Sequence, residues 1–191
     1  MKELKDMSLE ELWQLFPIIL KPHNPDYTLW YEDEKAAIIT CLNGVDIKRV
    51  SHIGSTSVLN LIAKPIVDIL LELPVDYDLG GTVNMLEASG WIVMDRNDTD
   101  KTIDLNKGYT PAGFAEKVFH LHVKQLGDWG ELYFKDYLRK YPEVARRYEE
   151  LKLGLKERFE HDRDAYTNAK SDFILGYTQK ARAEFCGRYI T

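Results

Sequence analysis

The chain opens with two segments whose apolar residues recur at helical spacing. A first helix is predicted after Ser8, because the spacing Ser8-x-x-Glu11 has the form of a capping box. Its apolar residues cover one broad face: Leu9, Leu12, Trp13, Leu15 and Phe16. Prolines at positions 17, 22 and 25 then break the chain, and a second helix is predicted over 27–42, ending at Asn43-Gly44.

The middle of the chain changes to patterns typical of β-strands. Strands are predicted over 47–53, 66–73, 91–94 and 119–124, with a short helical piece ending at Leu61 and a helix over 82–89. The run 66–73 is nearly continuous in apolar residues, which is typical of a strand covered on both faces. The segment 95–113 is polar and is expected to be rich in loops.

The last third of the chain, 131–191, is predicted to be helical. Its apolar stripe begins with alternating spacings of four and three, at Phe134, Leu138, Tyr141, Ala145 and Tyr148, and continues through Leu151, Leu155 and Phe159. Pro142 fits a helix N-terminus, and one last helix is expected to carry Tyr166, Ala169, Phe173, Tyr177 and Ala181. The order of helices, a mixed sheet and further helices predicts a single α+β domain over 1–191.

Composition and charge narrow the classes of function. The 191 residues carry 31 acidic and 25 basic side chains, a net charge of −6, which argues against an extended nucleic-acid surface but leaves room for a local basic pocket. No apolar run reaches the roughly 18 residues of a membrane span, and the first residues lack a signal core. The two cysteines, Cys41 and Cys186, are expected to be packing residues, and a cytoplasmic location is predicted.

The most informative chemistry lies between positions 52 and 70. A strand that ends in Gly54-Ser55-Thr56-Ser57 presents free backbone N–H groups and hydroxyls, which suits a phosphate. Thirteen residues after Ser55, Asp68 places a carboxylate inside an apolar strand, where it requires a metal, a cation or hydrogen bonds. Lys64, just before this strand, either meets a phosphate or pairs with Asp68.

The same stretch resembles the GrpB family. The resemblance rests on motifs that cover the chain from about residue 24: His52-Ile53-Gly54-Ser55-Thr56-Ser57-Val58, Ala63 to Ile69, His120-Leu121-His122-Val123, Phe134 to Arg139, Tyr148 to Lys152 and Tyr166 to Ile174. It implies a fold similar to DNA polymerase beta-like nucleotidyltransferases, and residues 1–23 look like a helical extension found in some members. It leaves the activity open, because similar domains fused to dephospho-CoA kinase have a folding-accessory role.

One departure from the nucleotidyltransferase pattern concerns the metal site. Those enzymes place two acidic residues at alternate positions of the strand, where both grip Mg²⁺. Here Leu70 occupies the second position, and Glu72 lies roughly 13 Å along the strand from Asp68, too far to share an ion. The two-carboxylate clamp is therefore missing.

Two histidines offer a replacement. His120 and His122 alternate on a strand, so they share a face, and one of them meets Asp68 across roughly 5 Å if the two strands are neighbours. Two histidines and one carboxylate form a divalent transition-metal site. Alternatively, the histidines hydrogen-bond Asp68 or Ser55 and hold the pocket closed.

The C-terminal helices add further phosphate candidates by similarity. Helices of larger nucleotidyltransferases supply Lys, Ser and Tyr to the triphosphate, which implies Lys152, Lys170 and Ser171 here; alternatively, each lysine is a solvated neighbour of a core tyrosine. Lys135 stands where the family often has Arg, and His52 is interpreted as an orienting residue.

Three hypotheses follow from these residues. The first is an Mg²⁺- or Mn²⁺-dependent nucleotidyltransferase or nucleotide-binding protein. The second is a noncatalytic binding or folding-accessory domain, and the third is a metal-dependent hydrolase with an Asp/His/His centre. The ligand is expected to be a nucleotide or another small molecule.

Overall fold

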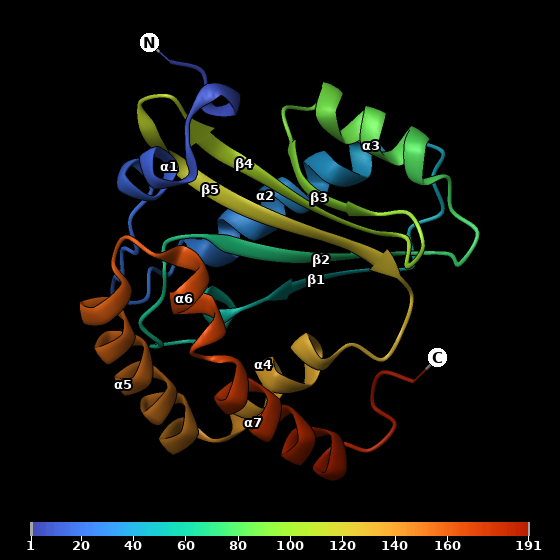
Figure 1. Ribbon diagram of the computed structural model, residues 1–191. Helices are drawn as coiled ribbons and strands as arrows, with labels where there is room; N and C mark the ends of the chain where they lie inside the picture. The colour runs from blue at the N-terminus through green and yellow to red at the C-terminus, as the bar shows by residue number, and fades with distance from the viewer. Residues whose placement is uncertain (1, 191) are drawn as a thin grey trace.

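The computed structural model describes residues 2–190, and a five-stranded mixed sheet forms its centre (Figure 1). The strands are β1 (Arg49–Ile53), β2 (Val67–Leu73), β3 (Ile92–Asn97), β4 (Thr102–Thr110) and β5 (Gly113–Gln125). They lie in the order β1-β2-β5-β4-β3, and only the central pair β2 and β5 is parallel. Asp68 pairs in register with His120, so the two strands meet as the sequence requires for a shared site.

The helices are divided between the two faces of the sheet. Before and between the strands come α1 (Leu9–Leu15), α2 (Tyr27–Cys41), the 3-10 turn η2 (Ser55–Ser57) and α3 (Leu79–Ala88). After β5 follow α4 (Gly130–Lys140), α5 (Pro142–Phe159), α6 (Arg163–Asn168) and α7 (Ser171–Glu184), and a short 3-10 turn, η1 (Leu4–Asp6), precedes α1. Figure 1 shows α4 to α7 gathered together beyond the β1 edge, whereas α2 lies behind the sheet.

The alternation of side chains along β2 separates the core from the site. Val67, Ile69, Leu71 and Leu73 are fully buried against α2 and α3 in the main hydrophobic core. Asp68, Leu70 and Glu72 point to the other face, because successive strand residues face opposite sides. The α+β class, the mixed sheet flanked by helices and the C-terminal helical segment are confirmed.

Several local predictions are confirmed. Ser8 and Glu11 form the capping box of α1: the Ser8 Oγ accepts from Glu11 N at 3.2 Å and the Glu11 carboxylate accepts from Ser8 N at 2.6 Å. Pro142 occupies the first turn of α5. Between residues 2 and 190, no helix is both long enough and apolar enough to cross a bilayer.

Three predictions are wrong in detail. Segment 95–113 is not a loop: it holds the end of β3 and all of β4, on which Asp104 bonds to His122 and Lys107 bonds to Glu34. The last helix is two helices, because the chain turns at Ala169–Lys170 between α6 and α7. Cys186 is exposed rather than packed, although Cys41 does contact the core.

Candidate functional site

Gly54 brings the Gly-Ser turn into direct contact with Asp68. The turn follows β1, whose last residue, Ile53, pairs with Asp68 across the antiparallel ladder. Gly54 has a φ of +69°, and a Cβ built on it would lie 2.1 Å from Asp68 Oδ2. Only glycine permits this backbone conformation and this close approach.

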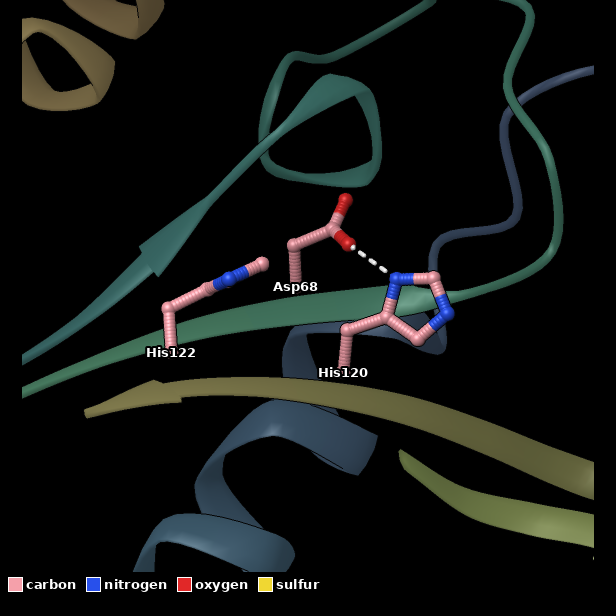
Figure 2. Close-up of side chains that lie close together, drawn as sticks. All are labelled: Asp68, His120 and His122. Atoms are coloured by element: carbon pink, nitrogen blue, oxygen red, sulfur yellow. Dashed lines mark hydrogen bonds and ion pairs between the residues drawn. The ribbon is translucent and has the colours of Figure 1, made fainter. Parts of the chain in front are cut away.

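His120 is bonded at both ring nitrogens. Its Nδ1 lies 3.0 Å from Asp68 Oδ1, and its Nε2 lies 2.8 Å from the Tyr109 hydroxyl, which also accepts from Arg163 Nη2 at 3.1 Å. Figure 2 shows the bond between Asp68 and His120. The register between β4 and β5 shifts at Gly108 (φ +88°), where extra β5 residues bulge between Phe114 and Phe119, and Tyr109 beyond the shift reaches His120.

Asp68 is ionised in this setting. Burial by itself raises the pKa of the carboxyl group, but the hydrogen bond from His120 and the positive charges of His120, His122 and Lys64 lower that pKa to about 2. Burial lowers the pKa of His120. The strand therefore presents a fixed negative charge to the turn.

His122 has a different partner. Its Nδ1 lies 2.6 Å from Asp104 Oδ1, on the β4 residue that pairs with it in register. Burial opposes the charged imidazole, but this hydrogen bond and the carboxylates of Asp68 and Asp104 raise the pKa of His122 overall. Asp68, His120 and His122 each offer a ligand atom within 4.8 Å of the others, a donor set that suits a divalent transition metal.

The structure supports the interpretation that no second carboxylate joins Asp68 on β2. Leu70 is fully buried and packs with Ile53 and Leu132. Glu72, also fully buried, binds the Arg49 guanidinium and accepts from Gly127 N at 3.1 Å. The charge of Glu72 is therefore neutralised by Arg49, and this carboxylate does not join Asp68.

A cavity of about 720 Å³ opens above Asp68, between the sheet and α4 to α7. Its volume is that of a small-molecule site. It is lined by five basic residues and three acidic ones: Lys64, Lys135, Lys152, Arg163 and Lys170 against Asp68, Glu131 and Asp164. A cationic cavity in a chain of net charge −6 indicates a local site for an anion.

Three lysines of this cavity are poorly solvated. Burial, reinforced by the charges of neighbouring basic groups, lowers the pKa of Lys64 and of Lys152 to about 7. Burial also lowers the pKa of Lys170 to about 8, and its ammonium lies 4.4 Å from the centre of the Tyr166 ring. Lys152 donates to Ser55 Oγ at 3.2 Å and to the Ile62 carbonyl. Neither Lys152 nor Lys170 is a solvated lysine.

The hydroxyls of the turn are used differently from one another. Ser55 and Thr56 line the cavity. However, Thr56 Oγ1 donates to the Ile66 carbonyl and contacts His52 Nε2 at 3.0 Å, which fits an orienting role for His52. Ser57 Oγ donates to the Gly54 carbonyl at 2.7 Å and is absent from the cavity wall, which corrects the expectation that its hydroxyl faces a phosphate.

Sequence reasoning missed four residues of the site. They are Asp104, Tyr109, Glu131 and Arg163, which lie on β4, on α4 and at the start of α6. The alternation Ile103-Asp104-Leu105-Asn106 is a strand signal that could have revealed Asp104. Nothing in the local sequence marks Arg163.

Comparisons with known proteins agree on one family. The family model described as GrpB protein matches residues 17–180. A UPF0157 protein of Pseudomonas aeruginosa is 35% identical over 163 residues, which cover 85% of this chain and 66% of the relative. The glutamate-rich protein GrpB of Alkalihalophilus pseudofirmus is 32% identical, with 82% and 91% covered.

A solved structure shares the fold. The crystal structure of the conserved protein GrpB from Enterococcus faecalis superposes with a TM-score of 0.74 at 28% identity. The match covers 87% of this chain and 99% of that one. The two proteins therefore share one fold.

Proposed function

We propose that this chain, which belongs to the GrpB family, binds a phosphorylated small molecule, with a nucleotide as the first candidate, together with Mg²⁺ or Mn²⁺. The observation that carries the proposal is a pair of cavity lysines. Within residues 2–190, the ammonium groups of Lys64 and Lys170 have neither a hydrogen-bond acceptor nor a salt-bridge partner, and Lys170 is only 9% exposed. An anion would stabilise the charged form of such a buried lysine.

A phosphate group matches the remaining contacts of the basic end. The backbone of Gly54 and the hydroxyl of Ser55 lie beside the cavity, and Arg163 can offer guanidinium donors. The lining also includes apolar side chains: Phe134, Leu138, Ile174 and Leu175. A nucleotide, with its charged phosphates and flat base, complements both parts.

Asp68 and the histidines fit a divalent cation at the floor of this cavity. The carboxylate oxygen and the imidazole nitrogens are ligands that such ions accept. A bound cation would supply charge that neutralises phosphate oxygens.

The buried Leu70 favours binding over two-metal nucleotidyl transfer. The second ligand position of β2 belongs to the hydrophobic core, so one carboxylate serves the site from this strand. The proposal is therefore a ligand-binding site with at most one metal. A noncatalytic binding role follows from this more directly than transfer chemistry does.

Isothermal titration calorimetry with ATP, ADP and inorganic triphosphate, each with and without MnCl₂, tests the proposal. We expect Lys170→Met to weaken binding about 10- to 100-fold, because a charge-assisted hydrogen bond is worth about 1.5–3 kcal/mol. Lys180→Met, on the exposed part of the same helix, is the matched control and should leave the affinity unchanged.

The melting temperature separates a ligand lysine from a structural one. If Lys170 is held for a ligand, its replacement removes an unpaired buried charge, so the free protein should melt at a higher temperature than wild type. A Lys170→Met protein that melts at a lower temperature, or that binds polyphosphate as tightly as Lys180→Met, would refute the proposal.

A further inference from the structure

The hydrogen bonds around His120 determine which ring nitrogen carries its proton. Asp68 Oδ1 lies 3.0 Å from His120 Nδ1, and a carboxylate oxygen is a hydrogen-bond acceptor, so the histidine nitrogen is the donor. Arg163 can only donate to the Tyr109 oxygen, which leaves the tyrosine proton free for His120 Nε2 at 2.8 Å. The single lone pair of a neutral His120 is therefore bonded to Tyr109 and directed away from Asp68.

His122 has the opposite arrangement. Its Nδ1 donates to Asp104 Oδ1 at 2.6 Å, so the lone pair of the neutral ring, the form that binds a metal, lies on Nε2. Nothing in the described part of the chain donates to that nitrogen. In Figure 2 the His122 ring extends toward the Asp68 carboxylate. A carboxylate behind a histidine, holding its tautomer, is the usual support of a metal-binding imidazole.

From these contacts we infer that the two histidines have different roles. His122 binds the divalent cation together with Asp68, and Asp104 orients it. His120 is a positioning residue: Tyr109 and Arg163 hold it as an N–H donor, and it fixes the Asp68 carboxylate beside Gly54. The inference rests on the proposed function, since it assigns the cation of that same site.

One carboxylate and one imidazole leave most positions of a six-coordinate ion open. Water and the phosphate oxygens of the ligand must occupy them. The cation and the phosphorylated ligand should therefore strengthen each other's binding by the same factor, as linkage requires. An imidazole ligand also favours Mn²⁺ over Mg²⁺.

Pulsed EPR of the Mn²⁺·ATP complex tests the assignment through the nitrogen nuclei bound to manganese. We expect coupling to one imidazole nitrogen in the wild-type protein and in His120→Asn, whose amide can still donate to Asp68. The coupling should disappear in His122→Asn. Asp104→Asn should weaken Mn²⁺ about 10- to 100-fold, and Tyr109→Phe should leave the coupling in place.

The outcomes separate this inference from the proposed function. Two imidazole couplings in wild type, or loss of the coupling in His120→Asn with its retention in His122→Asn, would overturn the assignment. Lysine-dependent ATP binding without any manganese–nitrogen coupling would also overturn it, while the phosphate pocket stands. Absence of both ATP and Mn²⁺ binding would overturn both. Circular dichroism of each variant identifies those that fail to fold.

Discussion

Gly54→Ala provides the sharpest test of the contact between the turn and the strand. The new methyl group would lie 2.1 Å from Asp68 Oδ2, well inside van der Waals contact, so either the turn or the carboxylate must move. The backbone conformation adds strain, because a φ of +69° with a ψ of −175° is nearly restricted to glycine. Asp68 would lose the position in which it faces the cavity.

The expected loss of stability can be estimated from these two effects. A residue in this backbone region costs on the order of 1–3 kcal/mol, and displacement of the carboxylate adds to that cost. For a chain of this length, 1 kcal/mol lowers the melting temperature by about 2–4 °C. For a total cost of about 3 kcal/mol, we expect a decrease of about 6–12 °C and the loss of Mn²⁺-dependent ATP binding.

Gly44→Ala is the matched control. Gly44 also has a positive φ, +90°, but no atom lies within 4 Å of a Cβ built there. Its replacement should cost only about 1–2 kcal/mol of backbone strain and leave ligand binding intact. Differential scanning calorimetry and titration of both variants decide the matter. If Gly54→Ala has the same melting temperature and the same affinity for ATP and Mn²⁺ as Gly44→Ala, the close contact between Gly54 and Asp68 is not required for ligand binding.

Four further predictions concern buried charge and packing. The ligand-free protein should become more stable from about pH 7 to pH 9. The pKa values of Lys64, Lys152 and Lys170 are lowered in the folded protein, so the unfolded chain binds more protons in this range. Thermal melts should therefore show a melting temperature that rises with pH, whereas lysines with unshifted pKa values would give a constant one. Over the same range, affinity for inorganic triphosphate should fall as the ammonium groups deprotonate, which calorimetry at each pH measures. Arg49→Met should lower the free energy of unfolding in urea by about 3 kcal/mol, because it leaves the fully buried Glu72 without its partner. Lys48→Met, which removes the exposed ion pair with Asp46, should lower it by less than about 1 kcal/mol. Leu70→Asp should destabilise the protein by more than about 3 kcal/mol instead of restoring a second metal ligand, and a folded variant with tighter Mn²⁺ binding would contradict this.

Local sequence patterns were sufficient to predict most helices and strands and the candidate site residues around the Gly54-Ser55 turn. The apolar run of β2 predicted a strand covered on both faces, and Asp68 stood out because a carboxylate in such a run needs compensation. The same run showed that Leu70 replaces a second acid. These conclusions need only the two-residue period of a strand.

Tertiary structure alone decided what each histidine does. Spacing placed His120 and His122 on one face, but their roles depend on β4, which was not expected as a strand because its residues are polar. The register shift at Gly108 brings Tyr109 to His120, while register alone places Asp104 beside His122. Pairing partners on another strand cannot be read from a residue's own neighbours.

The cavity depended on the same long-range contacts. The sequence alone is compatible with solvated lysines at positions 152 and 170. In the structure, the C-terminal helices pack over the sheet, and burial lowers the pKa of both Lys152 and Lys170. Arg163 enters from the start of α6 without any local signal. The spacing of apolar residues in the sequence determines which face of a helix or strand is apolar. Only the packing of these elements decides which charged side chains are removed from water, and a charge removed from water is stabilised by an ion of opposite sign.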